Sequence, residues 1–176
     1  MKCIKVLTDA DFELEIQKLD NPRIKYGARG IVINQDNKIA ILNKQLKNEY
    51  KLVGGGIEEN EDPKIAFKRE VLEEAGCNIE IIKGLGTIEE IKSHDNFKQL
   101  SYVFVAKVVG KFVEPTYTQK EIDEGSKLLW LNLDDAINKI KNSEKELIGS
   151  QYENLYHSKF IVRRDYEILK YYKENY

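Results

Sequence analysis

Cysteine is scarce in this chain of 176 residues, which contains only Cys3 and Cys77. Two cysteines so far apart match no metal-ligand spacing and provide no disulfide framework. Small chains without such a framework are typical of reducing compartments. We therefore expect a cytoplasmic protein whose fold depends on a hydrophobic core.

Long apolar runs and an excess of one charge are also missing. No stretch approaches the roughly 20 apolar residues of a membrane-spanning helix, and residues 1–9 show no signal-peptide pattern. The 28 basic and 30 acidic residues give a net charge of −2. A near-neutral chain has no general positive field to hold a nucleic-acid backbone. We expect no membrane partner and no nucleic acid bound through overall charge.

The chain has only three prolines, no internal repeat and no Gly/Ser-rich linker. A chain of this length typically forms one domain. We expect a main domain over residues 1–141, with a helical C-terminal extension over residues 142–176 packed on it. This extension is rich in tyrosine. It is expected to cover the main domain or to form a dimer interface, and stacking on RNA bases is the alternative.

The apolar residues that are present follow strand and helix patterns. Two β-branched runs around an Asn/Asp turn predict a hairpin within residues 30–42. Asn132 is expected to cap a helix that runs through Ile140. Further strands are predicted over 79–91, 100–109 and 128–131, and a terminal helix over 158–172. Strands mixed with helices in this way indicate a layered α/β or α+β domain.

The clearest helix signal lies between Asp62 and Gly76. Asp62 suits the N-cap, Pro63 the first helical position, and Gly76 the left-handed position that ends a helix. At about 100° per residue, this helix is expected to have an apolar face and an opposite acidic face. The apolar face is predicted to comprise Ile65, Phe67, Val71, Leu72 and Ala75, and the acidic face Glu70, Glu73 and Glu74.

The three glutamates of the acidic face are neighbours over one helical turn, where their charges repel one another. A bound cation usually compensates such repulsion. Oxygen ligands without His or Cys favour Mg²⁺, with Mn²⁺ as a substitute. The three glycines before the helix, Gly54 to Gly56, allow a phosphate-bearing substrate to approach the backbone. A solvated acidic helix face is the alternative interpretation of the same residues.

The spacing of the segment decides between these interpretations. Gly55 is followed by five residues, Glu61, seven residues, and then Arg-Glu-Val-Leu-Glu-Glu-Ala-Gly-Cys over residues 69–77. This pattern resembles the Nudix box at every specified position, with Val71 and Cys77 in its two apolar slots. A chance match at so many fixed positions is very rare. The chain is thus identified from its sequence as a member of the Nudix hydrolase (MutT-like) superfamily.

The resemblance implies an α/β/α sandwich with a mixed β-sheet, in which the box forms a loop, a helix and a second loop. It also implies hydrolysis of a pyrophosphate bond in a nucleoside diphosphate linked to another group, with Mg²⁺ as the cofactor. Nucleoside triphosphates, nucleotide sugars and dinucleoside polyphosphates are the substrate classes expected. Hydrolysis of RNA 5′ ends and a non-catalytic nucleotide sensor are the alternatives, and a homodimer is an open possibility.

The resemblance also assigns roles to the residues that match the box. Glu70, Glu73 and Glu74, with the carbonyl of Gly55, are expected to bind the metal, and Glu61, Arg69 and Gly76 are expected to be structural. The general base is expected to be Glu70 or, on a later loop before Trp130, Glu124, with Glu121 as the next choice. Weaker candidates for substrate binding are Arg29, Lys44 and Tyr50.

Overall fold

The strands of the computed structural model, which describes residues 1–176, form one mixed eight-stranded sheet. They are β1 (Cys3–Leu7), β2 (Arg23–Ile33), β3 (Ile39–Lys44), β4 (Glu49–Leu52), β5 (Gly54–Gly56), β6 (Asn78–Lys92), β7 (Phe97–Val109) and β8 (Ser126–Leu131). The main path through the sheet is β1-β6-β7-β2-β3-β4, with β5 paired to β2 and β8 paired to β3. The β1–β6 and β2–β7 pairs are parallel, and the other pairs are antiparallel.

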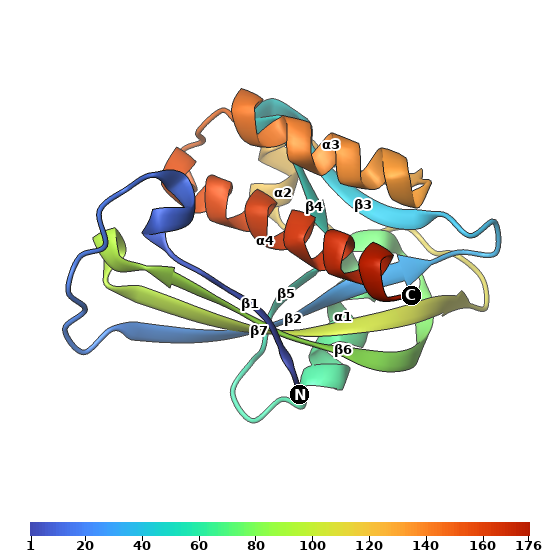
Figure 1. Cartoon of the computed structure of the whole chain (residues 1–176). Coiled ribbons are helices and arrows are strands. Elements are labelled where there is room, and N and C mark those ends of the chain that lie inside the picture. Colours follow the sequence, from blue (N-terminus) through green and yellow to red (C-terminus); the bar gives the residue numbers. More distant parts are fainter.

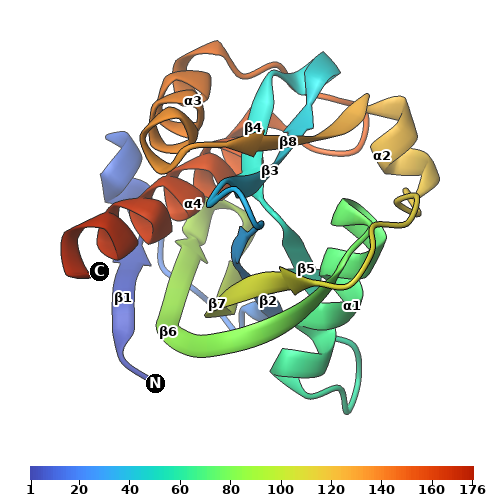
Figure 2. The same cartoon turned by 90° about the vertical axis from the view of Figure 1, so that its right-hand side faces the viewer.

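Four helices cover the sheet: α1 (Pro63–Ala75), α2 (Gln119–Asp123), α3 (Leu133–Glu146) and α4 (Leu155–Asn175). Figure 1 shows α3 and α4 on one side of the strands and α1 on the other. The view turned by 90° shows the same layers, with α2 near the end of β8 (Figure 2). This arrangement confirms the predicted α/β/α sandwich. None of the helices combines the length and apolar character that crossing a bilayer requires.

Alternation along the strands builds a separate hydrophobic core on each face of the sheet. Ile31 points into the core beneath α3 and α4, whereas its neighbour Val32 points into the core beneath α1. Val105 and Phe104 on β7 divide in the same way. Successive side chains of a strand point to opposite faces, so both faces of a central strand must be apolar when helices cover both.

The C-terminal helix α4 belongs to the first of these cores. Its residues Phe160, Val162, Ile168 and Leu169 are fully buried in the cluster that contains the sheet residues. The predicted boundary between residues 141 and 142 falls within α3, which is one continuous helix. The predicted terminal helix is present and extends beyond residues 158–172 at both ends.

Helix α1 begins and ends where its local signals predict. The Asp62 carboxylate accepts hydrogen bonds from the backbone N–H groups of Lys64 and Ile65, and Gly76 ends the helix with φ 60°. The predicted apolar face is partly wrong, because Ile65 is 60% exposed and Leu72 39% exposed. The helix is rotated so that its buried side is formed by Ala66, Phe67, Val71, Glu74 and Ala75. A glutamate therefore lies on the face that packs against the sheet.

Several other elements differ from their sequence-based expectations. Strands β1, β4 and β5 and helix α2 were not expected, because all four are short and have little periodicity. Asn132 occupies the N-cap of α3, as predicted, yet its side chain makes no capping hydrogen bond. The predicted hairpin is confirmed, with Ile33 of β2 opposite Ile39 of β3.

Candidate active site

The glycine segment β5 lies against the start of the acidic helix face. Gly55 pairs with Ala28 of β2, and the Glu70 carboxylate lies directly beside it. A Cβ atom added at Gly55 would lie 2.4 Å from Oε2 of Glu70, whereas one at Gly56 would meet no atom within 4 Å. The close approach therefore requires glycine at position 55.

Arg69 joins the loop to the helix. Its Nε and Nη2 atoms donate to the two carboxylate oxygens of Glu61 at 2.9 and 3.0 Å, and Nη2 also donates to the carbonyl of Gly56 at 3.0 Å. Nη1 donates to Glu70 at 2.8 Å and to Glu73 at 3.3 Å. One guanidinium thus fixes the position of the loop and of two carboxylates, since arginine has five donors in a rigid plane.

Glu74 lies beneath the glycine segment and is only 3% exposed. It accepts a hydrogen bond from the N–H of Gly54 at 2.7 Å and forms an ion pair with Lys51 at 2.8 Å. The buried carboxylate therefore has a charged partner and a backbone donor. A charge in the interior of a protein must be paired and hydrogen-bonded, and Glu74 is both.

The surroundings of Glu70 disfavour its charged form. Burial and the negative charge of Glu74 raise the pKa of Glu70, although Arg69 acts in the opposite direction. The carboxylates do not converge on a common point, and no group of three or more His, Cys, Asp or Glu side chains is arranged around one ion position. Glu70 and Glu73 are instead turned toward Arg69, and Glu74 toward Lys51.

A cavity of about 390 Å³ opens beside the glycine segment. Its lining includes Gly54, Gly55 and Gly56, together with Glu49 and Glu153 as its only acidic residues. The basic residues of the lining come from four strands and two helices far apart in the sequence: Arg23, Lys25, Arg29, Lys44, Lys51, Lys92, Lys120 and Arg164. The lining thus has an excess of basic side chains in a chain whose net charge is −2, although five of the eight are paired with a glutamate or an aspartate.

Two basic residues of the lining, Lys44 and Lys120, belong to a balanced ion-pair cluster with Lys47, which does not line the cavity. Lys44 pairs with Glu124 at 2.7 Å, and Lys47 pairs with Glu49 at 2.8 Å and with Glu153 at 2.7 Å. Lys120 lies 4.0 Å from Glu153. These contacts fasten the β3–β4 turn, α2 and the segment before α4 to one another.

The three candidate bases, Glu70, Glu124 and Glu121, lie in different surroundings. Glu124 is 2% exposed, binds Lys44 through one oxygen and the hydroxyl of Ser150 through the other at 2.8 Å, and does not line the cavity. Although burial opposes it, hydrogen bonding to Lys44 and Ser150 lowers the pKa of Glu124. Glu121 lies in α2, where it accepts a hydrogen bond from the backbone of Thr118 in a capping box. Glu70 and Glu121 do not line the cavity either, but Glu70 is the one of the three in contact with the glycine segment.

The three weaker substrate-binding candidates have different positions. Arg29 and Lys44 line the cavity, and Lys44 does so while paired with Glu124. Tyr50 lines a different cavity, beside α3, with Lys139 5.6 Å from its ring centre. The structure therefore brings Arg29 and Lys44 together with the glycine segment and leaves Tyr50 apart from it.

Sequence reasoning missed most of the cavity's basic residues. Lys92 and Arg164 are nearly fully buried and share Glu90, which lies 2.8 Å from Lys92 and 3.0 Å from Arg164. One signal was present in the sequence: the Arg164–Asp165 pair interrupts the apolar face of the terminal helix. Charged residues on the buried face of a helix indicate either an ion pair or a ligand.

Comparisons with known proteins support the family and the fold. The model of the NUDIX domain matches residues 24–150. Diphosphoinositol polyphosphate phosphohydrolase 3-alpha from Mus musculus is 28% identical over 121 residues, which cover 69% of this chain and 70% of that protein. Solved structures with the same fold include a MutT protein from Methanosarcina mazei Go1 (TM-score 0.54, 18% identity, 89% of this chain and 98% of that one). Another is a NUDIX hydrolase from Nitrosomonas europaea (TM-score 0.56, 16% identity, 82% of this chain and 93% of that one).

The domain match covers most of the chain and includes the glycine segment, Arg69 and the three glutamates of α1. The fold, the box geometry and the related phosphohydrolases all lead to one assignment. The chain belongs to the Nudix family and is a Nudix hydrolase.

Proposed function

We propose that this hydrolase cleaves a phosphoanhydride bond in a small molecule that carries several phosphate groups, with a divalent metal ion at the acidic face of α1. The observation that carries the proposal is the charge of the cavity beside the glycine segment, which has eight basic and two acidic side chains. A concave surface of one sign raises the local concentration of ligands of the opposite sign.

The cations of the cavity that have no ion-pair partner indicate how many negative charges the ligand carries. Arg23, Lys25 and Arg29 line the cavity without a carboxylate partner, whereas the other five basic residues each lie within ion-pair distance of a glutamate or aspartate. A ligand with several negative charges would supply the missing partners. A molecule with a single diphosphate would leave part of this surface unpaired.

The residues of the acidic face suit a hard divalent cation. Glu70, Glu73, Glu74 and the carbonyl of Gly55 offer only oxygen atoms, the ligand type that Mg²⁺ and Mn²⁺ prefer. Burial and the negative charge of Glu74 raise the pKa of Glu70, and a nearby cation favours the ionised carboxylate against both. When bound, a divalent cation withdraws negative charge from phosphate oxygens. Glu70 and Glu73 must exchange part of their contact with Arg69 to bind it.

The reaction itself requires water, a base and a leaving group. Water attacks the phosphorus atom, the P–O bond of the anhydride breaks, and the departing phosphate keeps the bonding electrons. The water proton is transferred to a carboxylate oxygen of Glu70, which lies against the glycine segment. Glu124 is less suitable because both of its oxygens are occupied by Lys44 and Ser150.

The curated relatives support the same substrate class, since the mouse protein is named as a diphosphoinositol polyphosphate phosphohydrolase. Nucleoside diphosphate derivatives, the substrates expected from the box alone, are the second candidate. Tyr26 favours them: it lines the cavity, is 51% exposed and offers an aromatic ring on which a base can stack. The ring of Phe97 is less accessible, because Arg23 and Lys92 lie over it at 4.8 and 5.2 Å.

Metal binding and hydrolysis together test the proposal. Purified protein is titrated with Mn²⁺ by calorimetry, and hydrolysis is followed by ³¹P NMR with Mg²⁺ or with EDTA. The substrates are a diphosphoinositol polyphosphate, nucleoside triphosphates, nucleotide sugars, dinucleoside polyphosphates and 5′-triphosphorylated RNA. Glu73→Gln is the best site variant, because the Glu73 side chain is 44% exposed and its loss does not leave a buried charge unpaired.

Glu80→Gln is the matched control, since Glu80 is an exposed glutamate on β6. The proposal predicts hydrolysis that stops with EDTA, and weaker Mn²⁺ binding with lower activity in Glu73→Gln but not in Glu80→Gln. Hydrolysis that continues with EDTA, or that is unchanged in Glu73→Gln, contradicts it.

A further inference from the structure

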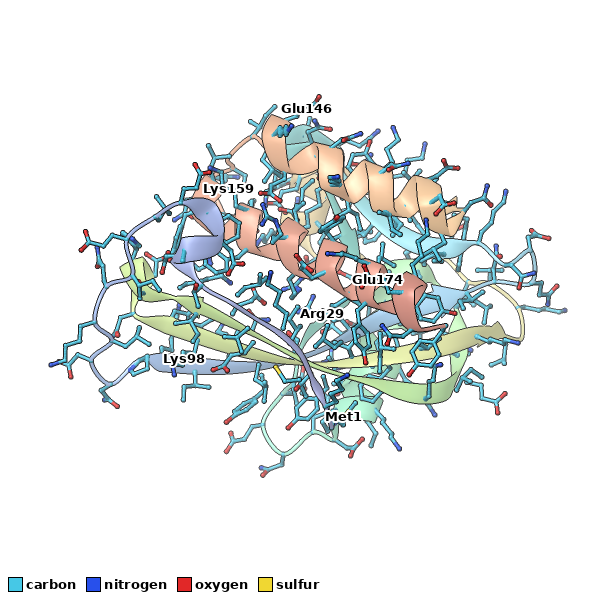
Figure 3. The ribbon with its side chains drawn as sticks, in the orientation of Figure 1. Met1, Arg29, Lys98, Glu146, Lys159 and Glu174 are labelled. Carbon is cyan, nitrogen blue, oxygen red and sulfur yellow. The ribbon has the colours of Figure 1, made fainter.

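Arg29 is a buried arginine without a charged partner. It lies on β2 opposite Gly54, is 4% exposed and lines the cationic cavity. Figure 3 labels it between α4 and the strands. The one hydrogen bond of its side chain runs from Nε to the hydroxyl of Ser101 on β7, at 3.2 Å. Burial and the nearby charge of Arg164 lower the pKa of Arg29 to about 10.

The carboxylates around Arg29 are all committed to other cations. Glu74 pairs with Lys51 at 2.8 Å. Asp165 binds the Nε of Arg164 at 2.7 Å and the backbone N–H of Leu52 at 2.9 Å.

Glu90, the third carboxylate that acts on Arg29, is shared between Lys92 and Arg164. This part of the site therefore holds four cations and three carboxylates, and Arg29 is the cation left over. An uncompensated buried charge is strongly unfavourable for a folded protein, so its presence calls for an explanation.

The position of the Arg29 guanidinium relative to the glycine segment explains why an unpaired charge is found here. A Cβ atom added at Gly27 would lie 3.1 Å from Nη2 of Arg29 and 3.0 Å from the carbonyl oxygen of Gly55. Nη2 of Arg29 and the Gly55 carbonyl oxygen therefore lie within about 6 Å of each other. A phosphate group bound by Arg29 would lie next to the carbonyl that is proposed above to hold the metal ion. The rigid fork of arginine also matches the oxygens of a phosphate group.

We propose that Arg29, oriented by Ser101, forms a phosphate-binding subsite on the floor of the cavity that holds a substrate phosphate beside the reacting one. The inference rests on the proposed function only where it concerns hydrolysis. Phosphate binding by Arg29 does not depend on that function. It assigns to Arg29 a specificity role: substrates with a phosphate at this position bind well, and those without one leave the charge unpaired. The unpaired charge of Arg29 lowers the stability of the free protein, and the contact that compensates it forms only when the ligand binds.

The test uses binding of inorganic pyrophosphate in the presence of EDTA, so that neither metal nor turnover is involved. Pyrophosphate affinity is measured by calorimetry, and the melting temperature is measured with and without pyrophosphate. The variants are Arg29→Met, which removes the charge at similar length, and Ser101→Ala, which removes the orienting hydroxyl. Lys38→Met is the control, because it removes a positive charge from an exposed residue that does not line the cavity.

The subsite predicts that Arg29→Met binds pyrophosphate about tenfold more weakly or worse, the magnitude expected when a charged hydrogen bond is lost. It also predicts that the free Arg29→Met protein melts at a higher temperature than the wild type. Ser101→Ala should weaken binding to a smaller extent, and Lys38→Met should leave binding unchanged.

Equal pyrophosphate affinity in wild type and Arg29→Met overturns the inference, as does wild-type protein that does not bind pyrophosphate. A lower melting temperature of free Arg29→Met also overturns it, because Arg29 would then be a structural charge. Failure of the proposed function is a separate result: pyrophosphate binding that depends on Arg29, without hydrolysis of any substrate, contradicts the proposed reaction and leaves the subsite in place.

Discussion

The carboxylate of Glu74 lies directly beneath Gly54, whose N–H donates a hydrogen bond to it at 2.7 Å. The contact places a box glutamate on the buried side of α1, where Lys51 compensates its charge. Glu74 thus connects the helix, the glycine segment and strand β4. Its position predicts that the site and the stability of the fold are coupled.

Replacing Glu74 should therefore destabilise the protein as well as inactivate it. In Glu74→Gln the ammonium of Lys51, whose side chain is 11% exposed, loses its partner. Removing one member of a buried ion pair costs about 3–5 kcal/mol. Urea unfolding at pH 7 measures this change, with Glu80→Gln as the exposed control. A loss no larger than that of the control would show that the Lys51 pair is not important for folding.

Gly55→Ala and Gly56→Ala form a matched pair for the glycine segment. The alanine methyl group at position 55 would lie 2.4 Å from Glu70, whereas at position 56 it would meet nothing within 4 Å. We expect Gly55→Ala to displace the Glu70 carboxylate and to lose most activity, and Gly56→Ala to retain activity. Steady-state hydrolysis with the best substrate measures both. Equal activity of the two variants would mean that the Gly55–Glu70 contact does not matter for the reaction.

Acid should unfold the protein through its buried carboxylates. Burial opposes ionisation of Glu90, but the charges of Lys92 and Arg164 lower its pKa to about 2. Burial likewise opposes ionisation of Glu153, and Lys47 lowers its pKa to about 2. In the unfolded chain a glutamate has a pKa of about 4.3. Each group therefore stabilises the fold fully above that pH, and this contribution is lost as the pH falls toward 2.

Melting temperatures between pH 7 and pH 2 measure this dependence. We expect a steady decrease below about pH 5, and a shallower decrease in Glu153→Gln, which has one such carboxylate fewer. A melting temperature that does not change between pH 5 and pH 2 would contradict the assignment of these ion pairs.

Asp165 links α4 to the sheet, and we expect the packing of α4 on the sheet to depend on it. The residue is fully buried and accepts hydrogen bonds from the N–H of Leu52 and from Arg164. We expect Asp165→Asn to lower the free energy of unfolding by about 3 kcal/mol or more. Asp134→Asn removes an exposed pair with Lys173 and should cost about 1 kcal/mol or less. Similar losses in the two variants would show that the buried pair adds little.

Local signals made much of the fold predictable. Asp62, Pro63 and Gly76 mark the ends of α1 because capping depends on neighbours in sequence. The Nudix box was visible for the same reason, since its residues occur at fixed spacing within 55–77. The exposure of Ile65 and Leu72 was not predictable, because the rotation of α1 is set by how it packs on the sheet.

The cationic cavity could not be predicted because its residues become neighbours only in the folded chain. Arg29, Lys92 and Arg164 come from β2, β6 and α4. Arg29 was expected to bind substrate as a charge flanking a hairpin, but its lack of a partner depends on the pairing of Arg164 with Glu90 and Asp165. The role of Glu124 as a base stays a prediction, and its contacts with Lys44 and Ser150 favour Glu70 instead.

A comparison of substrates tests most directly whether the cavity selects molecules that carry several phosphate groups. The value of kcat/KM is measured with Mg²⁺ for a diphosphoinositol polyphosphate, a nucleoside triphosphate and a nucleotide sugar under one set of conditions. We predict that the densely phosphorylated substrate has the highest kcat/KM, and that this preference decreases in Arg29→Met. If a nucleotide is the best substrate and the diphosphoinositol polyphosphate is not hydrolysed, the cationic cavity does not select multiply phosphorylated substrates and the account is wrong.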